Sequence, residues 1–224
     1  MKKLNRKTTN LPANKPAKVL QFGGGNFLRA FTNWMIDELN QQTTFNGGVI
    51  IVKPTKSGDY TALRKQDGLF HVLTKGIKNG ELITETQLIE CVQAIIHPYL
   101  AWETYLKSAE TPTLRFIISN TTETGIQFNP EEPFGDYSPK EFPGKLTRWL
   151  FHRWQYFKGS PESGCIILPC ELIENNGLQL KNCILQYANL WNLADDFKAW
   201  IDQHNHFCNT LVDRIVPGFP KDNI

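Results

Sequence analysis

The chain has 224 residues and a formal net charge of +2, with 24 basic and 22 acidic side chains. This balance argues against a nucleic-acid-binding protein, which usually carries a basic stripe, and no apolar stretch approaches the roughly 18 residues of a membrane span. Five cysteines without a Cys-x-x-Cys pair indicate free thiols in a reducing compartment. We therefore expect a soluble, cytoplasmic protein that binds neither nucleic acid nor membrane.

The first half of the chain predicts one βαβ unit. Residues 1–16 are polar and contain two prolines, so we expect a loosely held lead-in. Residues 17–22, AKVLQF, form an apolar run that ends at glycine and predicts a buried strand. Residues 27–41 carry apolar side chains at helical spacing, and residues 48–54 predict a second buried strand. Strand, helix and strand in this order form a right-handed unit with parallel strands.

The rest of the chain continues the alternation of strands and helices. Residues 67–90 contain Asn-Gly between two alternating segments, which predicts a β-hairpin. Two further buried strands are expected over residues 114–120 and 164–170, and the expected helices cover residues 98–110, 144–159, 178–192 and 194–205. Such alternation is typical of an α/β fold, here a doubly wound, mostly parallel sheet with helices on both faces.

The most informative stretch is QFGGGNFLRAF, residues 21–31, at the first strand-to-helix turn. In a βαβ unit one glycine permits this tight turn, and a second lets the backbone approach a pyrophosphate. Gly23 and Gly25 occupy these two positions, whereas the third position of the fingerprint is Leu28. Because a strand precedes the motif and a helix and a second strand follow it, we favour a Rossmann-type dinucleotide site over a tight turn without a ligand.

Two basic side chains lie near this expected site in the sequence. Arg29 lies in the first turn of the helix, where a positive charge is unfavourable without an anion nearby. It therefore either faces a bound phosphate or pairs with a carboxylate. Lys53 ends the second strand, where NAD-binding units usually carry Asp or Glu for the ribose hydroxyls. It either reads a 2′-phosphate, which would favour NADP, or faces solvent, which is the interpretation we slightly prefer.

Three other motifs have simple interpretations. Residues 202–208, DQHNHFC, alternate potential metal ligands, but the helical pattern continues into them and would fan the ligands apart, so we expect no metal site. Cys170 ends a strand without an assigned base and is expected to be a buried thiol. Residues 129–139, NPEEPFGDYSP, are proline-rich and acidic and predict a surface loop or flap.

Two motifs carry a resemblance to a known family. Residues 23–30, GGGNFLRA, resemble the Gly-x-Gly-x-Phe-x-Arg-Ala opening of the long-chain mannitol dehydrogenases, a family of polyol and uronate reductases. Residues 207–217, FCNTLVDRIVP, are similar to the family's Phe-x-x-small-x-Val-Asp-Arg-Ile-x-Pro signature. Further similar segments, QDGLF, RFIISNTTETGI, KLTRWLF and IILPCELIENNG, extend the resemblance over residues 21–222 and indicate the tagaturonate reductase branch of the family.

The resemblance implies a fold, a cofactor and a reaction. It implies a Rossmann-type domain that binds NAD and docks against a largely helical C-terminal domain, with interconversion of D-altronate and D-tagaturonate as the reaction. The family's general acid/base is a lysine in a Lys-x5-Asn-x2-His motif, which these 224 residues do not contain. We therefore expect the cofactor-binding part of such an enzyme, inactive alone. In this division residues 1–16 are the lead-in, 17–205 the dinucleotide-binding domain and 206–224 a segment leading to the helical domain.

The resemblance also implies the roles of individual residues. Past the third strand, Thr121, Thr122 and Glu123 match a turn near the cofactor. Asp213 matches an acidic residue near the substrate site and is the candidate catalytic residue. The residues that would line the cofactor pyrophosphate are Gly23, Gly24, Gly25, Asn26, Phe27, Leu28 and Arg29.

One departure from the family pattern bears on the substrate. Mannitol dehydrogenases carry Cys-Asp-Asn after the fourth strand, and that Asn helps to stabilise the oxyanion. Residues 170–172 read Cys-Glu-Leu instead, and Leu172 cannot donate a hydrogen bond, which argues against mannitol oxidation. Asn175 or Asn176 is a candidate replacement. A fructuronate- or mannitol-type reductase and a stand-alone nucleotide-binding module remain alternatives.

Overall fold

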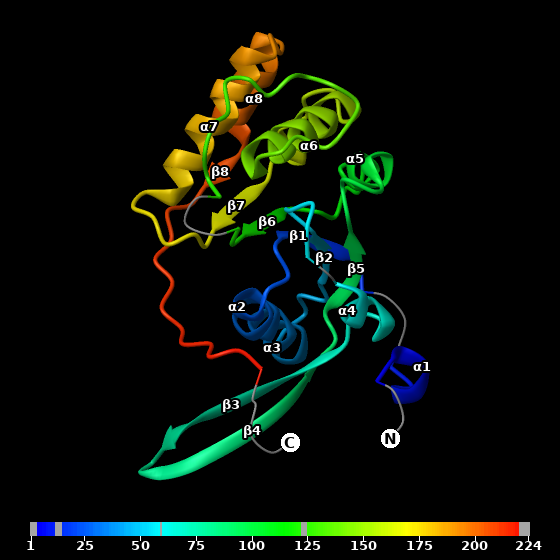
Figure 1. Ribbon diagram of the computed structural model, residues 1–224, viewed down its shortest axis with the longest axis vertical. Coiled ribbons are helices and arrows are strands. Elements are labelled where there is room, and N and C mark those ends of the chain that lie inside the picture. The colour runs from blue at the N-terminus through cyan, green and yellow to red at the C-terminus, as the bar shows by residue number, and fades with distance from the viewer. Residues whose placement is uncertain (1–3, 12–14, 59, 122–124, 220–224) are drawn as a thin grey trace.

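A parallel six-stranded sheet forms the centre of the molecule (Figure 1). The computed structural model describes residues 4–11, 15–58, 60–121 and 125–219. The strand order is β5-β2-β1-β6-β7-β8, and all neighbouring pairs are parallel. The strands are β1 (Ala17–Phe22), β2 (Gly48–Val52), β5 (Val92–Ile96), β6 (Phe116–Ser119), β7 (Ile166–Pro169) and β8 (His206–Phe207). Because the order reverses between β1 and β6, this is a doubly wound sheet whose switch point lies between those two strands.

The side chains of the central strands alternate between two apolar cores, one on each face of the sheet. From β1, Leu20 and Phe22 enter the first core, whereas Val19 enters the second. From β6, Ile117 and Ile118 divide in the same way. Strands buried on both faces have nearly continuous apolar sequences. The predictions of β1, β2, β6 and β7 are confirmed for this reason.

Helices cover both cores, as expected from the sequence (Figure 1). The first core is covered by α5 (Trp102–Ser108), α6 (Phe142–Tyr156), α7 (Asn176–Leu190) and α8 (Asp195–His204). On the second lie α4 (Thr61–Lys65) and a helical run of α2 (Asn26–Leu28), the π-helical turn η1 (Arg29–Asn33) and α3 (Trp34–Gln42). A single-turn 3-10 helix, η2 (Pro161–Ser163), precedes β7. None of the helices in the described ranges combines the length and the apolar character needed to span a membrane.

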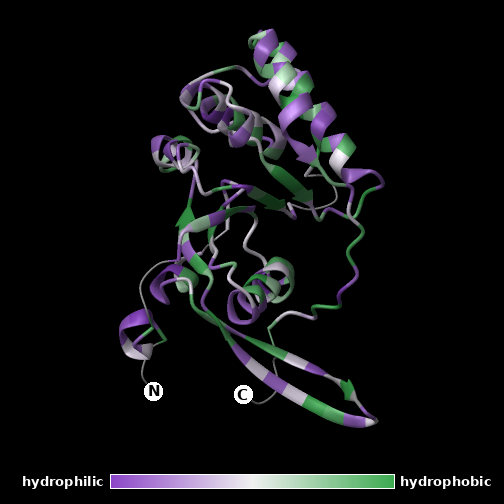
Figure 2. Ribbon diagram, turned by 180° about the vertical axis from the view of Figure 1, so that it is seen from behind, coloured by the Kyte–Doolittle hydropathy of each residue, from purple (hydrophilic) through white to green (hydrophobic). Residues whose placement is uncertain are grey.

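The predicted hairpin is confirmed and projects from the body of the molecule (Figures 1 and 2). It consists of β3 (Phe70–Lys78) and β4 (Glu81–Ile89), which pair antiparallel around Asn79 and Gly80. Both turn residues have positive φ, 53° and 84°, as a two-residue hairpin turn requires. Only the base of the hairpin packs against the second core.

Several elements were not predicted, among them β5 and α1 (Arg6–Thr9). β5 forms one edge of the sheet, and α1 lies within the segment expected to be a loosely held lead-in. The Arg6 guanidinium donates hydrogen bonds to the carbonyl oxygens of Glu90 at 2.7 Å and Val92 at 3.1 Å. The prediction of a loose lead-in is therefore wrong for this helix, because Arg6 satisfies backbone acceptors where β4 leads into β5.

The acidic, proline-rich loop predicted over residues 129–139 is fixed to the helices of the first core. Arg148 donates to the Gly135 carbonyl oxygen at 2.6 Å, and the Trp191 indole donates to the Glu132 carbonyl oxygen at 2.8 Å. The buried Glu132 carboxylate in turn accepts the Lys140 N–H at 2.9 Å. A hinged flap would have to break these bonds in order to open, so the loop is a fixed part of the fold.

Asp37 is a buried carboxylate in α3. Its Oδ2 accepts the Glu90 N–H at 2.8 Å, while its Oδ1 has no hydrogen-bond partner within the described part of the chain. Burial raises the pKa of Asp37 to about 6, although the hydrogen bond from Glu90 opposes this shift. Since the folded state then holds a proton more tightly than the unfolded state, stability falls as the pH rises from about 4 to about 6.

We expect Asp37→Asn to raise the free energy of unfolding by about 1–2 kcal/mol at pH 7.5 and to change it little at pH 4. The amide oxygen can still accept the Glu90 N–H, but no charge has to be buried. Urea unfolding followed by circular dichroism at both pH values measures the difference. Asp196→Asn, at an exposed site on α8, is the control. A loss of stability at pH 7.5 would show that the ionised carboxylate contributes favourably.

Candidate functional site

The candidate site lies at the switch point, where β1 and β6 end side by side. The Gly23 N–H donates to the Val52 carbonyl oxygen at 3.0 Å, and the Asn120 N–H donates to the Phe22 carbonyl oxygen at 3.1 Å. The first bond joins the glycine turn (residues 23–26) to the end of β2, and the second joins the β6 turn (residues 119–121) to the end of β1. Doubly wound sheets bind their ligands outside the carboxyl ends of the strands at this point of the topology.

The three glycines of the glycine turn differ in what a side chain at their position would contact. Gly23 has φ +106°, and a Cβ built on it would lie 2.7 Å from the Asn120 carbonyl oxygen. Gly24 donates its N–H to the Tyr60 hydroxyl at 2.8 Å, and a Cβ there would come within 3.0 Å of the Tyr60 ring. Within the described residues, and apart from its own chain neighbours, a Cβ on Gly25 would meet no atom within 4 Å. Packing and a positive φ therefore require glycine at position 23, packing is tight at Gly24, and Gly25 borders open space.

That open space lies in front of a helix N-terminus. Gly25 is the N-cap, with φ −68° and ψ 172°, and the helical run continues from Asn26 to Gln42. The first N–H groups of a helix have no partner inside the helix, and the helix dipole adds partial positive charge there. Together they favour an anion at this position.

Arg29 adds a full positive charge one turn into this helix. Its Nη2 donates to the Asn26 Oδ1 at 2.5 Å, and the guanidinium lies 5.6 Å from the centre of the Phe70 ring. Burial lowers the pKa of Arg29. Its Nε is buried without a hydrogen-bond partner, and in the described ranges no acidic side chain forms an ion pair with it. The alternative in which Arg29 pairs with a carboxylate is thus not observed in this part of the chain.

Gln21 supports the glycine turn from behind. It is fully buried, and its Nε2 donates to the Gly23 carbonyl oxygen at 2.8 Å. Its Oε1 accepts hydrogen bonds from Asn33 at 2.7 Å and Thr32 at 3.2 Å, both in the π-helical turn. Gln21 therefore connects the end of β1 and the glycine turn to the helix that follows. The sequence analysis missed this role, although a polar residue inside an apolar strand and directly before the glycines was the available signal.

Lys53 is placed differently from our expectation. The side chain is 2% exposed, and its Nζ donates to the carbonyl oxygens of Thr55, Lys56 and Ser57 at 2.7, 3.1 and 2.6 Å. The preferred interpretation of a solvent-facing lysine is wrong, because the loop after β2 folds its carbonyl groups back over the amine. An ammonium group has three protons to donate, and these three carbonyl groups are enough to engage them.

The structure places the other expected residues as follows. Leu28 is 1% exposed and belongs to the second core, so only its backbone can face a ligand. Phe27 packs against Phe31 with ring centres 5.3 Å apart. Thr121 belongs to the β6 turn, whereas Thr122 and Glu123 lie outside the described residues.

Asp213 is exposed on the segment that follows β8. This segment, residues 208–219, runs from β8 past the start of the helix (Figure 1). The Arg214 guanidinium lies 4.9 Å from the Trp34 ring centre, and a Cβ on Gly218 would lie 3.3 Å from the Asn26 Nδ2. These contacts bring the segment that carries Asp213 to the helix that begins at the glycine turn.

Asn176 is not available to a ligand. The side chain is 1% exposed, and its Nδ2 donates to the carbonyl oxygens of Pro169, Glu171 and Thr210 at 3.0–3.1 Å. Its Oδ1 accepts the N–H groups of Gly177 and Thr210. Asn176 therefore ties the end of β7 to the segment of residues 208–219. Of the two residues considered as replacements for the family's oxyanion-stabilising Asn, only the exposed Asn175 remains.

The remaining chemical candidates do not form a site. Cys170 is 5% exposed, and burial raises the pKa of its thiol to about 12, which confirms the expected buried thiol. All five cysteines are free. The helical pattern predicted into residues 202–208 ends at His204, and β8 begins at His206. Within the described residues, no three His, Cys, Asp or Glu side chains come together as metal ligands would.

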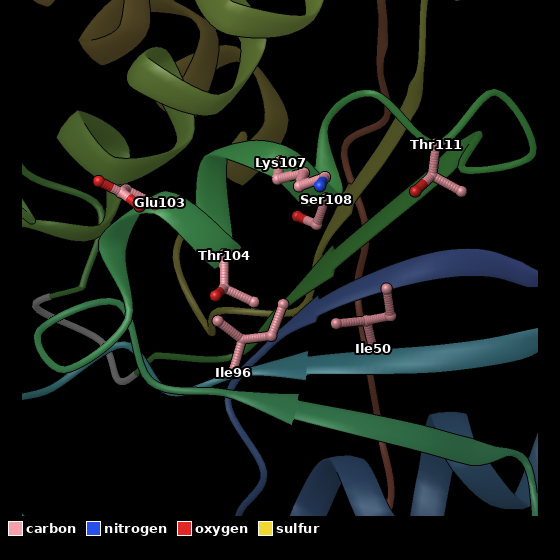
Figure 3. Close-up of a pocket in the computed structure, with 7 residues that line it drawn as sticks. All are labelled: Ile50, Ile96, Glu103, Thr104, Lys107, Ser108 and Thr111. Carbon is pink, nitrogen blue, oxygen red and sulfur yellow. The ribbon is translucent and has the colours of Figure 1, made fainter.

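A hollow of about 360 Å³ lies beside α5, away from the glycine turn (Figure 3). Ile50 and Ile96 approach it from the sheet, and the other lining residues belong to α5 or the loop after it. It contains no residue of the glycine turn or the β6 turn. We therefore assign no function to it. Its lining residues are Ile50, Ile96, Glu103, Thr104, Lys107, Ser108 and Thr111.

Comparison with known proteins identifies relatives over the whole chain. Residues 17–223 match the family model described as the mannitol dehydrogenase Rossmann domain. The chain is 48% identical over 224 residues to the altronate oxidoreductase of Bacillus subtilis and 45% identical to that of Bacteroides thetaiotaomicron. Each match covers 100% of this chain and 47% of the relative. The chain thus spans about half the length of the curated relatives it matches.

Two solved structures share the fold. The mannitol 2-dehydrogenase of Pseudomonas fluorescens, in a ternary complex with NAD and D-mannitol, has a TM-score of 0.76 and 21% identity. It covers 97% of this chain, which corresponds to 48% of that enzyme. A substrate-free D-sorbitol dehydrogenase has a TM-score of 0.70 and 19% identity, over 91% of this chain and 46% of the other. The predicted Rossmann-type fold is confirmed.

The different roles of the glycines give a matched pair of variants. We expect Gly23→Ala to lower the free energy of unfolding by about 2–4 kcal/mol, because its Cβ collides with the Asn120 carbonyl group at a positive φ. Gly25→Ala should change stability by less than about 1 kcal/mol, since its Cβ meets open space. Urea unfolding of both variants measures the effect. Equal stabilities would contradict the close approach of the two turns.

Proposed function

Because this chain belongs to the mannitol dehydrogenase family, whose Rossmann domain matches residues 17–223, we propose that it is the NAD-binding part of an oxidoreductase interconverting D-altronate and D-tagaturonate. The observation that carries the proposal is the open space in front of Gly25, at the N-terminus of the helix from Asn26 to Gln42. The substrate proposal, a uronate and its aldonate, is supported by relatives named altronate oxidoreductase at 48% and 45% identity.

We propose that the cofactor pyrophosphate lies in front of Gly25. The backbone N–H groups of Asn26, Phe27 and Leu28 would face it, and Arg29 would neutralise part of its charge. The absence of an acidic partner for Arg29 among the described residues supports this role. Gly23 and Gly24 would contribute by their lack of side chains, since each packs against a neighbouring turn or ring.

The far half of the dinucleotide would lie against the β6 turn. In a Rossmann fold the two mononucleotides lie on either side of the switch point. We propose that Thr121, with Thr122 and Glu123, lies beside the nicotinamide half. Residues 17–205 would form the dinucleotide-binding domain, to which His206 and Phe207 add β8 before the rest of 206–224 leads away.

We propose NAD and not NADP as the cofactor. A lysine at the end of β2 would favour a 2′-phosphate if its amine were free. Lys53 instead donates to three carbonyl groups of its own loop, so it is held away from that role. Lys56, in the same loop, is exposed and is the residue to test if a 2′-phosphate is recognised.

The chemistry divides between the cofactor and the protein. NAD supplies the hydride chemistry, while the chain's residues bind and orient it. Reduction of a ketone also needs a proton donor within hydrogen-bond reach of the substrate oxygen. Asn176 and Lys53 cannot serve, since both donate to backbone carbonyl groups. We propose that a lysine in a helical domain docked on this one supplies the proton, with Asp213 contributing from residues 208–219.

We expect the 224-residue chain to bind NADH in calorimetric titration, about tenfold or more tightly than NADPH. Gly25→Val should abolish binding, because its side chain occupies the space of the pyrophosphate. Gly76→Val is the matched control, since a Cβ there also meets open space but lies in the hairpin. Wild-type affinity in Gly25→Val would contradict the proposed site.

The same titration tests the choice of cofactor. Tighter binding of NADPH would contradict the proposed preference for NAD. In that case Lys56→Ala should remove the preference if the exposed Lys56 reads the 2′-phosphate. A preference that survives Lys56→Ala would point back to Lys53.

We expect no measurable NADH oxidation with D-tagaturonate from the 224-residue chain, because these residues do not contain the Lys-x5-Asn-x2-His motif whose lysine would donate the proton. Fusion to the unmatched remainder of the Bacillus subtilis relative should restore turnover, measured as loss of NADH absorbance. In that fusion Asp213→Asn should lower kcat by about 100-fold or more. Turnover by the 224-residue chain alone would overturn this division of roles.

A further inference from the structure

Glu171 is a buried carboxylate directly after β7. It is 2% exposed, and both of its oxygen atoms accept hydrogen bonds from the β6 turn. The Ser119 hydroxyl donates to Oε2 at 3.0 Å. The Thr121 N–H and the Thr121 hydroxyl both donate to Oε1, each at 3.0 Å. One side chain in the loop after β7 therefore fixes both ends of the β6 turn.

The charge of Glu171 has no partner of opposite sign in the described ranges. No lysine, arginine or histidine forms an ion pair with it there. Burial raises the pKa of Glu171, although the hydrogen bonds from Thr121 and Ser119 oppose the shift. Burying an unpaired carboxylate costs stability, and an uncharged Gln would fill the same volume. A Gln would keep an acceptor oxygen for Thr121, and the Ser119 hydroxyl could turn to accept from the amide, so the hydrogen bonds of the turn alone do not require a charge.

The position of Glu171 suggests what the charge does. The β6 turn contains Asn120, whose carbonyl oxygen defines the conformation of Gly23. Glu171 therefore supports the wall of the switch point opposite the glycine turn. β6 and β7 belong to the second half of the sheet, beyond the reversal of strand order, where the nicotinamide mononucleotide lies in this fold.

We propose that Glu171 is a positioning residue that holds the β6 turn for the nicotinamide half of the cofactor, and that its fixed negative charge favours the oxidised over the reduced form. The nicotinamide ring carries a positive charge in NAD⁺ and none in NADH. A buried carboxylate behind the turn therefore stabilises NAD⁺ selectively, while its hydrogen bonds serve both forms equally. This inference rests on the proposed NAD-binding function.

Calorimetric titration of the 224-residue chain with NAD⁺ and with NADH tests the charge. We expect Glu171→Gln to lower the ratio of NAD⁺ affinity to NADH affinity by about three- to tenfold, the size expected of one buried charge. Glu174→Gln is the matched control, because it removes a carboxylate that is exposed in the same loop. Solvent and salt screen that charge, so the ratio should stay at the wild-type value.

Glu171→Asp separates positioning from charge and serves if Glu171→Gln does not fold. It keeps the charge but shortens the side chain by one methylene, so the bonds to Ser119 and Thr121 cannot all form. We expect weaker binding of both forms by a similar factor, an unchanged ratio, and faster hydrogen exchange of the Thr121 amide. Wild-type affinity and exchange in this variant would overturn the positioning role.

The remaining outcomes are distinguishable. An unchanged ratio in Glu171→Gln, or an equal fall in Glu171→Gln and Glu174→Gln, would overturn the role of the charge. A ratio that falls in Glu171→Asp as far as in Glu171→Gln would assign the effect to geometry and also overturn it. A wild-type chain that binds neither NAD⁺ nor NADH would instead refute the proposed function, and the inference would fall with it.

Discussion

The close approach of the glycine turn to the β6 turn determines the geometry of the sheet's carboxyl edge. The Asn120 carbonyl oxygen occupies the space beside Gly23, so the chain turns there with a φ that only glycine adopts easily. This contact lets β6 pair with β1 up to Phe22 and Ser119, at the ends of both strands. It also directs the chain into a helix whose first N–H groups face the switch point. A larger residue at position 23 would separate the two halves of the fold and the ligand groups that each half binds.

Buried polar side chains hold both turns in place. Gln21 supports the glycine turn from one side, Glu171 supports the β6 turn from the other, and Asn176 ties the end of β7 to residues 208–219. The two apolar cores supply most of the driving force for folding, but apolar contacts are non-directional. Hydrogen bonds in a region of low dielectric constant are directional and costly to leave unmade, so they specify one arrangement of the backbone. The position of the turns therefore depends on these few side chains more than on the cores.

The sequence predicted the elements that are buried on both sides and the turn between the first two of them. β1, β2, β6 and β7 are mostly apolar runs, whereas β5 was missed because its central residues, Gln93 to Ile95, are only partly buried or exposed at the sheet edge. The glycine pattern predicted the kind of turn. It did not predict that Gly23 has to be glycine because of the Asn120 carbonyl oxygen, nearly a hundred residues away in the sequence. Lys53 was misjudged because its environment depends on the path of the loop after β2. Gln21 and Glu171 have their roles through partners on other strands or helices, and a local pattern cannot reveal these.

Under the proposed function, the hydrogen bonds of these buried polar side chains explain why cofactor binding and proton transfer belong to different parts of the protein. The polar groups that shape the switch point must keep their hydrogen bonds to hold the turns, so they cannot also exchange protons with a substrate. Asp213 is different: it lies on the exposed side of residues 208–219, between Leu211 and Ile215, which are 94% and 90% exposed. The opposite side of that segment is partly buried, as Arg214 is over Trp34. Relatives about twice as long as this chain have the additional length to cover the exposed side. A substrate held between Asp213 and that additional length would meet a fixed cofactor on one side and a separate proton donor on the other.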